Sequence, residues 1–223
     1  MKAIVQSEFA DLRTFVPSSL AIFVLVYVFL CYSLQTSAMI SILCAMEPLL
    51  ALFGIANSGM VNGWDRFRAA LPFSRSDVVV GRYLAILLSS VVTVVIAFAL
   101  GMVGNVAGSA VVPGFDDMPL FELAATCICS AAVSLVLVAC MQPFLVKFGN
   151  AKGLRYAVLA FLVVIGLGIA WLSQVLDAPM MYEVADWIEA NAGLMVAGIA
   201  AIGALALAAS CAISLRIYKR KDL

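Results

Sequence analysis

The chain has 223 residues, of which 65% are hydrophobic and only 12% are charged, and its mean hydropathy is +1.13. A soluble domain of this length could not bury so much apolar surface, so the composition excludes a globular protein in water. The thirteen basic and thirteen acidic residues cancel in number but are spread unevenly, so their order along the chain is the more informative property.

Six stretches of the chain are long and apolar enough to cross a bilayer. A helix rises about 1.5 Å per residue, so about 20 mostly apolar residues cover a hydrocarbon core of roughly 30 Å. We therefore expect an all-α, polytopic integral membrane protein whose residues 1–223 form a single transmembrane domain. The predicted membrane helices cover approximately residues 15–34, 38–60, 78–104, 120–142, 156–176 and 193–215.

The basic residues indicate which parts of the chain face the cytoplasm. All thirteen lie near the two ends of the chain or around the connections that follow the second and fourth predicted helices. The three connections on the opposite side contain none. Loops rich in Lys and Arg stay in the cytoplasm, so we expect both termini there and a chain that crosses the membrane several times.

Two shorter segments are amphipathic. In residues 1–14 most apolar side chains share one side of a helix, with Glu8 as the exception, which predicts a helix on the inner membrane surface. In residues 180–190, Met181, Val184 and Trp187 recur at helical spacing among acidic residues, which predicts a short helix at the outer surface.

Three glycines lie at the end of the third predicted membrane helix. Gly101, Gly104 and Gly108 are expected to end this helix and lead into the outer loop. The alternative is that they let another helix approach closely, as small residues do in membranes.

The chemistry-bearing residues argue against an enzyme. All six cysteines lie in apolar stretches, where a thiol packs as a small hydrophobe, so we expect neither disulfides nor a metal site. Cys127 and Cys129 form a C-x-C pair, but positions two apart on a helix point to different faces. The chain has no histidine and no phosphate-binding loop, which excludes Ser-His catalysis and an ATPase site of its own.

Glu47 is the only acidic residue deep within a predicted membrane helix. A charged side chain there costs about 2.5 to 3.5 kcal/mol on insertion scales, so such residues usually face the protein interior. Pro48 follows it and is expected to kink the helix. Two interpretations are open: Glu47 belongs to a substrate or proton pathway, or it is a protonated acid packed between helices.

The longest hydrophilic stretch on the cytoplasmic side covers residues 61–77. Trp64, Phe67 and Leu71 stand at positions i, i+3 and i+7, which places them on one face of a helix. Pro72 must end that helix. The sequence therefore predicts a short helix lying parallel to the membrane.

Ser74 and Asp77 have the spacing of a capping box at the start of the third membrane helix. This capping box predicts that the third membrane helix begins just after Ser74. The alternative for the whole segment is a plain cytoplasmic connector with a tryptophan at the membrane interface.

Two parts of this region carry a resemblance to a known family. They read Asn62-Gly63-Trp64-Asp65-Arg66-Phe67 and Leu71-Pro72-Phe73-Ser74-Arg75-Ser76-Asp77-Val78-Val79-Val80-Gly81-Arg82-Tyr83-Leu84. Together they resemble the cytoplasmic hallmark of type 2 ATP-binding cassette (ABC) transporter permeases, in the subgroup of small bacterial six-helix exporter subunits. In many relatives an acidic pair precedes the Asn-Gly-Trp, where this chain has Ser58-Gly59-Met60-Val61.

The resemblance implies a division of labour between subunits. Two permease subunits, identical or different, would form the path, while a cytoplasmic ABC ATPase dimer binds ATP and Mg²⁺ and pushes on the short cytoplasmic helix, the coupling helix. The implied ATPase-contact residues are Trp64, Asp65, Arg66, Phe67, Arg68 and Leu71. The aromatic pair would anchor the contact and the arginines would form its charged rim.

The resemblance implies a multi-pass location in a bacterial plasma (inner) membrane. The implied function is export of an unidentified peptide, lipid or amphipathic drug, with no cofactor in this chain and no nucleic-acid partner. The alternative is a non-transporting membrane immunity or sensor protein that binds a cytoplasmic partner.

Overall fold

The computed structural model describes residues 20–61, 75–148, 156, 187 and 190–219. Every regular element in these ranges is a helix, which confirms for them the expected all-α fold. The fifth predicted membrane helix lies outside the described residues except for Tyr156. The predicted surface helices, 1–14 and 180–190, also lie outside them apart from Trp187 and Ala190.

The described chain forms one short turn of helix and five longer helices. Four of the long helices are sufficiently long and apolar to cross a membrane, and the helix Leu20–Leu34 is shorter. In chain order the elements are the helix Leu20–Leu34, the 3₁₀ turn η1 (Ser37–Met39), α2 (Ile40–Val61), α4 (Arg75–Val111), α5 (Leu120–Phe148) and α8 (Ala192–Lys219).

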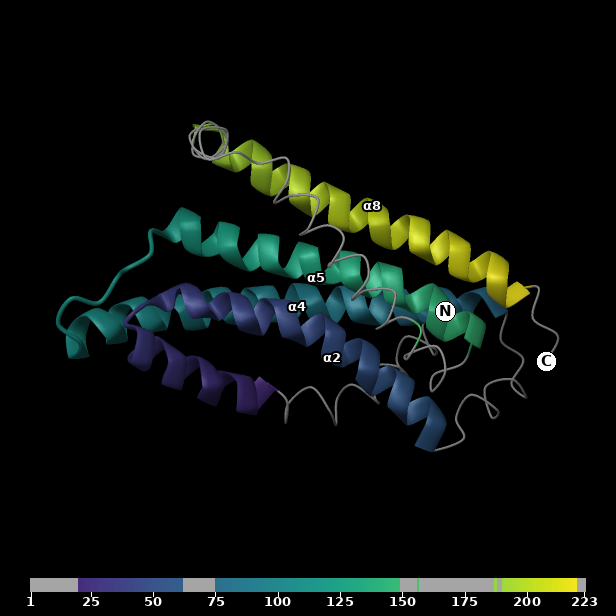
Figure 1. The fold of residues 1–223 in the computed structure, drawn as a ribbon, viewed down its shortest axis with the longest axis horizontal. Helices are drawn as coiled ribbons and strands as arrows, with labels where there is room; N and C mark the ends of the chain where they lie inside the picture. The colour runs from purple at the N-terminus through teal and green to yellow at the C-terminus, as the bar shows by residue number, and fades with distance from the viewer. Residues whose placement is uncertain (1–19, 62–74, 149–155, 157–186, 188–189, 220–223) are drawn as a thin grey trace.

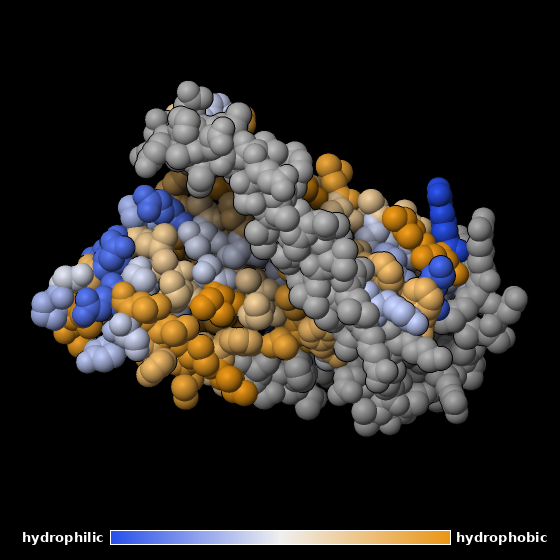
Figure 2. All heavy atoms as spheres, in the orientation of Figure 1, coloured by the Kyte–Doolittle hydropathy of each residue, from blue (hydrophilic) through white to orange (hydrophobic). Residues whose placement is uncertain are grey.

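The long helices pack side by side in one bundle (Figure 1). α2, α5 and α8 run in one direction, and α4 and the helix Leu20–Leu34 run in the other. α5 contacts α2, α4 and α8, and α4 contacts α2, α5 and α8, so both α4 and α5 lie inside the described bundle. Figure 2 shows hydrophilic residues at the two ends of the bundle and apolar residues along its described sides, as suits a protein surrounded by lipid.

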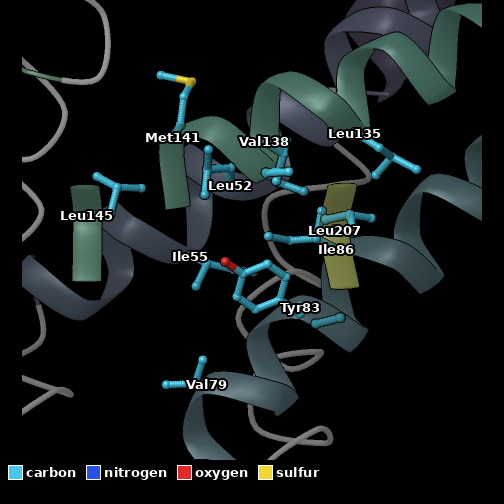
Figure 3. Close-up of a cluster of buried hydrophobic side chains, with 13 residues drawn as sticks. Leu52, Ile55, Val79, Tyr83, Ile86, Leu135, Val138, Met141, Leu145 and Leu207 are labelled. Atoms are coloured by element: carbon cyan, nitrogen blue, oxygen red, sulfur yellow. The ribbon is translucent and has the colours of Figure 1, made fainter. Parts of the chain in front are cut away.

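Two buried clusters fill the bundle. One joins α2, α4, α5 and α8 towards the end where α4 begins (Figure 3), and its largest members include Leu52, Ile55, Tyr83, Ile86, Val138, Met141 and Leu145. The other joins the helix Leu20–Leu34 to α2, α4 and α5 towards the opposite end, and it includes Tyr27, Ile40, Leu43, Leu123 and the thiols of Cys31, Cys44 and Cys127.

α5 and α8 approach closely because small residues meet between them. A Cβ atom at Gly203 would stand 3.1 Å from the carbonyl oxygen of Ala132. One heptad further along both helices, the Ser210 hydroxyl donates a hydrogen bond of 2.5 Å to the carbonyl of Ala139. Lipid is as apolar as the helix surfaces, so close packing and hydrogen bonds of this kind hold membrane helices together.

Proline explains why the Ala139 carbonyl is available. Pro143 lies four residues further along α5 and has no N–H to donate back to Ala139. A carbonyl left free inside a membrane needs another donor, and Ser210 of α8 supplies it. A second serine, Ser134, similarly links α5 to α2 through the carbonyl of Ala45, at 2.6 Å.

α4 is longer than the sequence indicated. It continues through Gly101, Gly104 and Gly108 to Val111, so the expectation that these glycines end the helix is wrong. Each glycine instead lies where another side chain approaches: Leu123 of α5 at Gly101, Tyr27 at Gly104, and Phe115 of the following loop at Gly108. The alternative interpretation, that these glycines let a neighbouring part of the chain approach α4 closely, agrees with the structure.

The connections at the far end of α4 are tied to one another. Gln35 has a positive φ of 55°, and its carbonyl accepts a hydrogen bond of 2.9 Å from the Asp116 amide. The side chain of Asn105 on α4 donates to the carbonyl of Met118 at 2.8 Å. The loop between α4 and α5 is thereby fastened to α4 and to the turn before α2.

Candidate functional site

The structure describes the two helices that the predicted coupling segment joins. α2 ends at Val61 and α4 begins at Arg75. Asp77 lies in the first turn of α4, where a negatively charged side chain interacts favourably with the helix dipole. The other predicted capping residue, Ser74, lies outside the described residues, as do the predicted ATPase-contact residues Trp64, Asp65, Arg66, Phe67, Arg68 and Leu71.

A chain of hydroxyl groups connects the start of α4 to the rest of the bundle. Tyr83 is only 6% exposed, and its hydroxyl oxygen lies 2.7 Å from Ser210 Oγ and 2.9 Å from Ser214 Oγ, both on α8. Ser210 donates its proton to Ala139, so it accepts the proton of Tyr83, whose oxygen is then free to accept from Ser214. This Tyr83 link joins α4, α8 and α5.

The strength of the Tyr83 link can be measured with a double-mutant cycle. We expect Tyr83→Phe to lower the free energy of unfolding by about 1 kcal/mol, within the range found for hydrogen bonds between membrane helices. Combining it with Ser210→Ala should cost less than the sum of the two single changes, because both remove the same bond. Unfolding in mixed detergent micelles would give the four values; strictly additive effects would show that the two hydroxyls do not interact.

Glu47 lies within the bundle, as its position in the sequence indicated. It is 2% exposed on α2, close to the hydroxyls of Ser89 and Thr93 on α4. Neither carboxyl oxygen makes a hydrogen bond of regular geometry within the described part of the chain. The Ser89 hydroxyl instead donates to the carbonyl of Ile86 in its own helix, at 2.9 Å.

Sequence analysis did not identify a second buried polar side chain, Gln142 of α5. It is fully buried, and no described group bonds to its amide oxygen or its amide nitrogen. The only available signal was an uncharged amide in an apolar run directly before Pro143, and such a residue does not stand out by charge. Glu47 and Gln142 give the bundle two buried polar groups with unused hydrogen-bonding capacity.

The described residues contain no group of three or more His, Cys, Asp or Glu side chains suited to hold a metal ion. All six cysteines lie in described helices as free thiols, three of them buried. The described interior therefore contains hydroxyl, amide, carboxyl and thiol groups in an apolar surround.

These observations define a helical protein that crosses the membrane several times, with four described helices long enough to do so. Its family follows from the sequence as a whole. Residues 4–219 match the family model described as "ABC-2 family transporter protein", and the chain belongs to this family of transporter membrane proteins. The resemblance to ABC transporter permeases is thereby confirmed at the level of the family. No curated protein and no solved structure is significantly similar to the chain.

Membership carries two consequences. The chain is the membrane component of a transporter, and the family works together with an ABC ATPase.

Proposed function

We propose that the chain is the permease subunit of a bacterial ABC exporter in the plasma membrane. Two permease subunits form the path, and a separate ABC ATPase dimer supplies ATP hydrolysis with its own ATP and Mg²⁺. The family match over residues 4–219 is the observation that carries this proposal. The unidentified substrate belongs to the apolar or amphipathic molecules, such as a peptide, a lipid or a drug.

Six membrane crossings fit the directions of the described helices. α5 and α8 run parallel, so the end of α5 and the start of α8 lie at opposite ends of the bundle. An odd number of crossings must join them, and the apolar stretch 156–176 provides one. Together with the predicted membrane helix 15–34, the proposed total is six, and the order of the basic residues supports a cytoplasmic location for both termini.

The arrangement also suits transmission of force from a cytoplasmic partner. The segment 61–77 joins α2 to α4 at the end of the bundle where α5 and α8 also end. Movement of this segment would displace the start of α4, and the Tyr83 link would carry that displacement to α8 and α5. Packed helices move as rigid bodies, so a small push at one end can shift the whole group.

Co-purification with a candidate ABC ATPase tests the proposal. We expect the ATPase to co-purify with the wild-type chain in detergent and to be lost when Trp64→Ala and Phe67→Ala are combined, since buried aromatic anchors each contribute about 2 kcal/mol or more to an interface. A matched control, Trp187→Ala with Phe121→Ala, removes two exposed aromatic residues assigned to the outer side and should retain the ATPase.

The outcomes separate the parts of the proposal. Failure of the wild type to bind any ABC ATPase encoded beside it would contradict the transporter role and favour a non-transporting immunity or sensor protein. Equal binding by the wild type and the Trp64 and Phe67 double variant would leave the permease role intact but show that the contact residues are wrong.

A further inference from the structure

Three buried thiols lie in one cluster between the helix Leu20–Leu34, α2 and α5. Cys31, Cys44 and Cys127 each come from a different one of these helices, and they are at most 7% exposed. The thiol of Cys44 lies within hydrogen-bonding reach of the thiol of Cys127. Sequence analysis treated every cysteine as a small hydrophobic side chain, because the helix packing that brings two thiols together is not visible in the sequence.

α2 and α5 approach each other closely where this pair lies. Cys127, Ala131 and Ser134 stand at positions i, i+4 and i+7 of α5, so they share one face of the helix, and all three are buried. Ser134 donates its hydrogen bond of 2.6 Å to the carbonyl of Ala45, the residue after Cys44. Small side chains on such a face let two membrane helices come close together. A disulfide needs a close approach, because it usually joins Cα atoms about 4.4 to 6.8 Å apart.

A route from the lipid leads to the thiol cluster. Cys31 also lines an apolar cleft of about 290 Å³ between the helix Leu20–Leu34 and the second half of α4. Val103 and Val111 on the wall of this cleft are 63% and 70% exposed, so the cleft opens towards lipid. In the proposed orientation, it lies in the outer half of the membrane. A small apolar molecule dissolved in the bilayer can therefore reach the cluster from the side.

We propose that Cys44 and Cys127 form a redox-active pair, which an organic hydroperoxide in the bilayer converts into a disulfide between α2 and α5. One sulfur attacks the hydroperoxide and breaks its O–O bond, which leaves a sulfenic acid on the protein and releases an alcohol that takes the thiol proton. The second sulfur then displaces the hydroxyl group, which leaves as water with the second thiol proton, and the S–S bond forms. The two thiols lose two electrons and the hydroperoxide gains them. The free thiols of the structure are the reduced state.

The disulfide fixes α2 to α5 in the outer half of the bundle. α2 is one of the two helices that the coupling segment joins, and α5 packs against α2, α4 and α8. A covalent bond between α2 and α5 therefore opposes any movement of one helix against the other. That oxidation slows transport rests on the function proposed above, whereas formation of the disulfide does not.

Oxidation of the purified full chain in lipid nanodiscs tests the pair without an ATPase. The probe is cumene hydroperoxide, and digestion without reductant followed by mass spectrometry identifies joined peptides. We expect a joined product that contains Cys44 and Cys127 and that dithiothreitol separates. Cys44→Ala and Cys127→Ala should each abolish it. Cys129→Ala is the matched control and should retain it, because Cys129 lies two residues after Cys127 on another face of α5 and outside the cluster.

Cys140 shows whether the oxidant was delivered, because it is exposed on α5 and the same digest reports its oxidised forms. Oxidation of Cys140 without a link between Cys44 and Cys127 would overturn the pair. A link from Cys127 to Cys31 in place of Cys44 would also overturn it.

Transport by the complex with its ATPase tests the consequence of the disulfide. Cumene hydroperoxide should lower transport by the wild type, dithiothreitol should restore it, and Cys127→Ala should be spared. A disulfide that forms and leaves transport unchanged would overturn the regulatory consequence alone. Absence of transport from the reduced wild-type complex would count against the proposed function, while the peptide analysis would still decide whether the pair exists.

Discussion

Gly203→Leu is expected to lower the free energy of unfolding by about 3 kcal/mol, the largest effect of the glycine substitutions considered. The Cβ atom alone would stand 3.1 Å from the Ala132 carbonyl oxygen and 3.3 Å from its Cα, both backbone atoms that cannot rotate away. The remaining leucine atoms would force α5 and α8 apart, and overpacking of this kind typically costs about 1 to 3 kcal/mol. Thermal unfolding of the detergent-solubilised protein measures the loss.

Gly198→Leu provides the matched control on the same helix. No heavy atom lies within 4 Å of a Cβ built at Gly198, and this glycine is exposed, so its unfolding midpoint should stay close to that of the wild type. Separation of α5 from α8 at Gly203 should also break the bond between Ser210 and Ala139, one heptad away. Similar losses of stability in the two variants would indicate a general cost of leucine in α8 and would contradict close packing at Gly203.

Hydropathy predicted the apolar helices of the described part, because it is a property of a single segment of chain. The end of α4 shows where such local reasoning fails. Three glycines lower helix propensity in water, but membrane helices tolerate glycine because no water competes for their backbone groups. The contacts of Gly101 with Leu123 and of Gly104 with Tyr27 depend on which helices are neighbours, and that arrangement is not visible in the sequence.

The buried polar residues also differ in whether the sequence alone could identify them. Glu47 could be identified from the sequence because a carboxyl group in an apolar run is rare. Ser210 and Ser214 could not, because serine is common in membrane helices and its role depends on its partner. Pro143 does identify Ala139 as a carbonyl without a helical donor, but only the alignment of α5 with α8 shows that Ser210 meets it. The coupling segment stays a prediction from resemblance, since its central residues lie outside the described part.

Glu47→Met is expected to raise the free energy of unfolding by about 1 to 3 kcal/mol. Both carboxyl oxygens are buried without a regular hydrogen bond, and an unsatisfied buried polar group costs about this much. Methionine has a similar length and is unbranched, so it fills the same space between α2 and α4 without that cost. Glu47→Gln keeps a polar group there and should change stability less. Unfolding of both variants in the same micelles provides the comparison, and a loss of stability in Glu47→Met would show that Ser89 or Thr93 binds the carboxyl group.

A more stable Glu47→Met variant would make the function of the carboxyl group measurable, because impaired folding could no longer explain lost activity. Natural proteins retain destabilising groups where activity needs them, so transport by the complex with its ATPase separates the two interpretations of Glu47. Transport at the wild-type rate in Glu47→Met would identify Glu47 as a packed acid without a role in the path. Transport lost in both Glu47→Met and Glu47→Gln, with the ATPase still bound, would place the carboxyl group in the pathway and show that an amide cannot replace it.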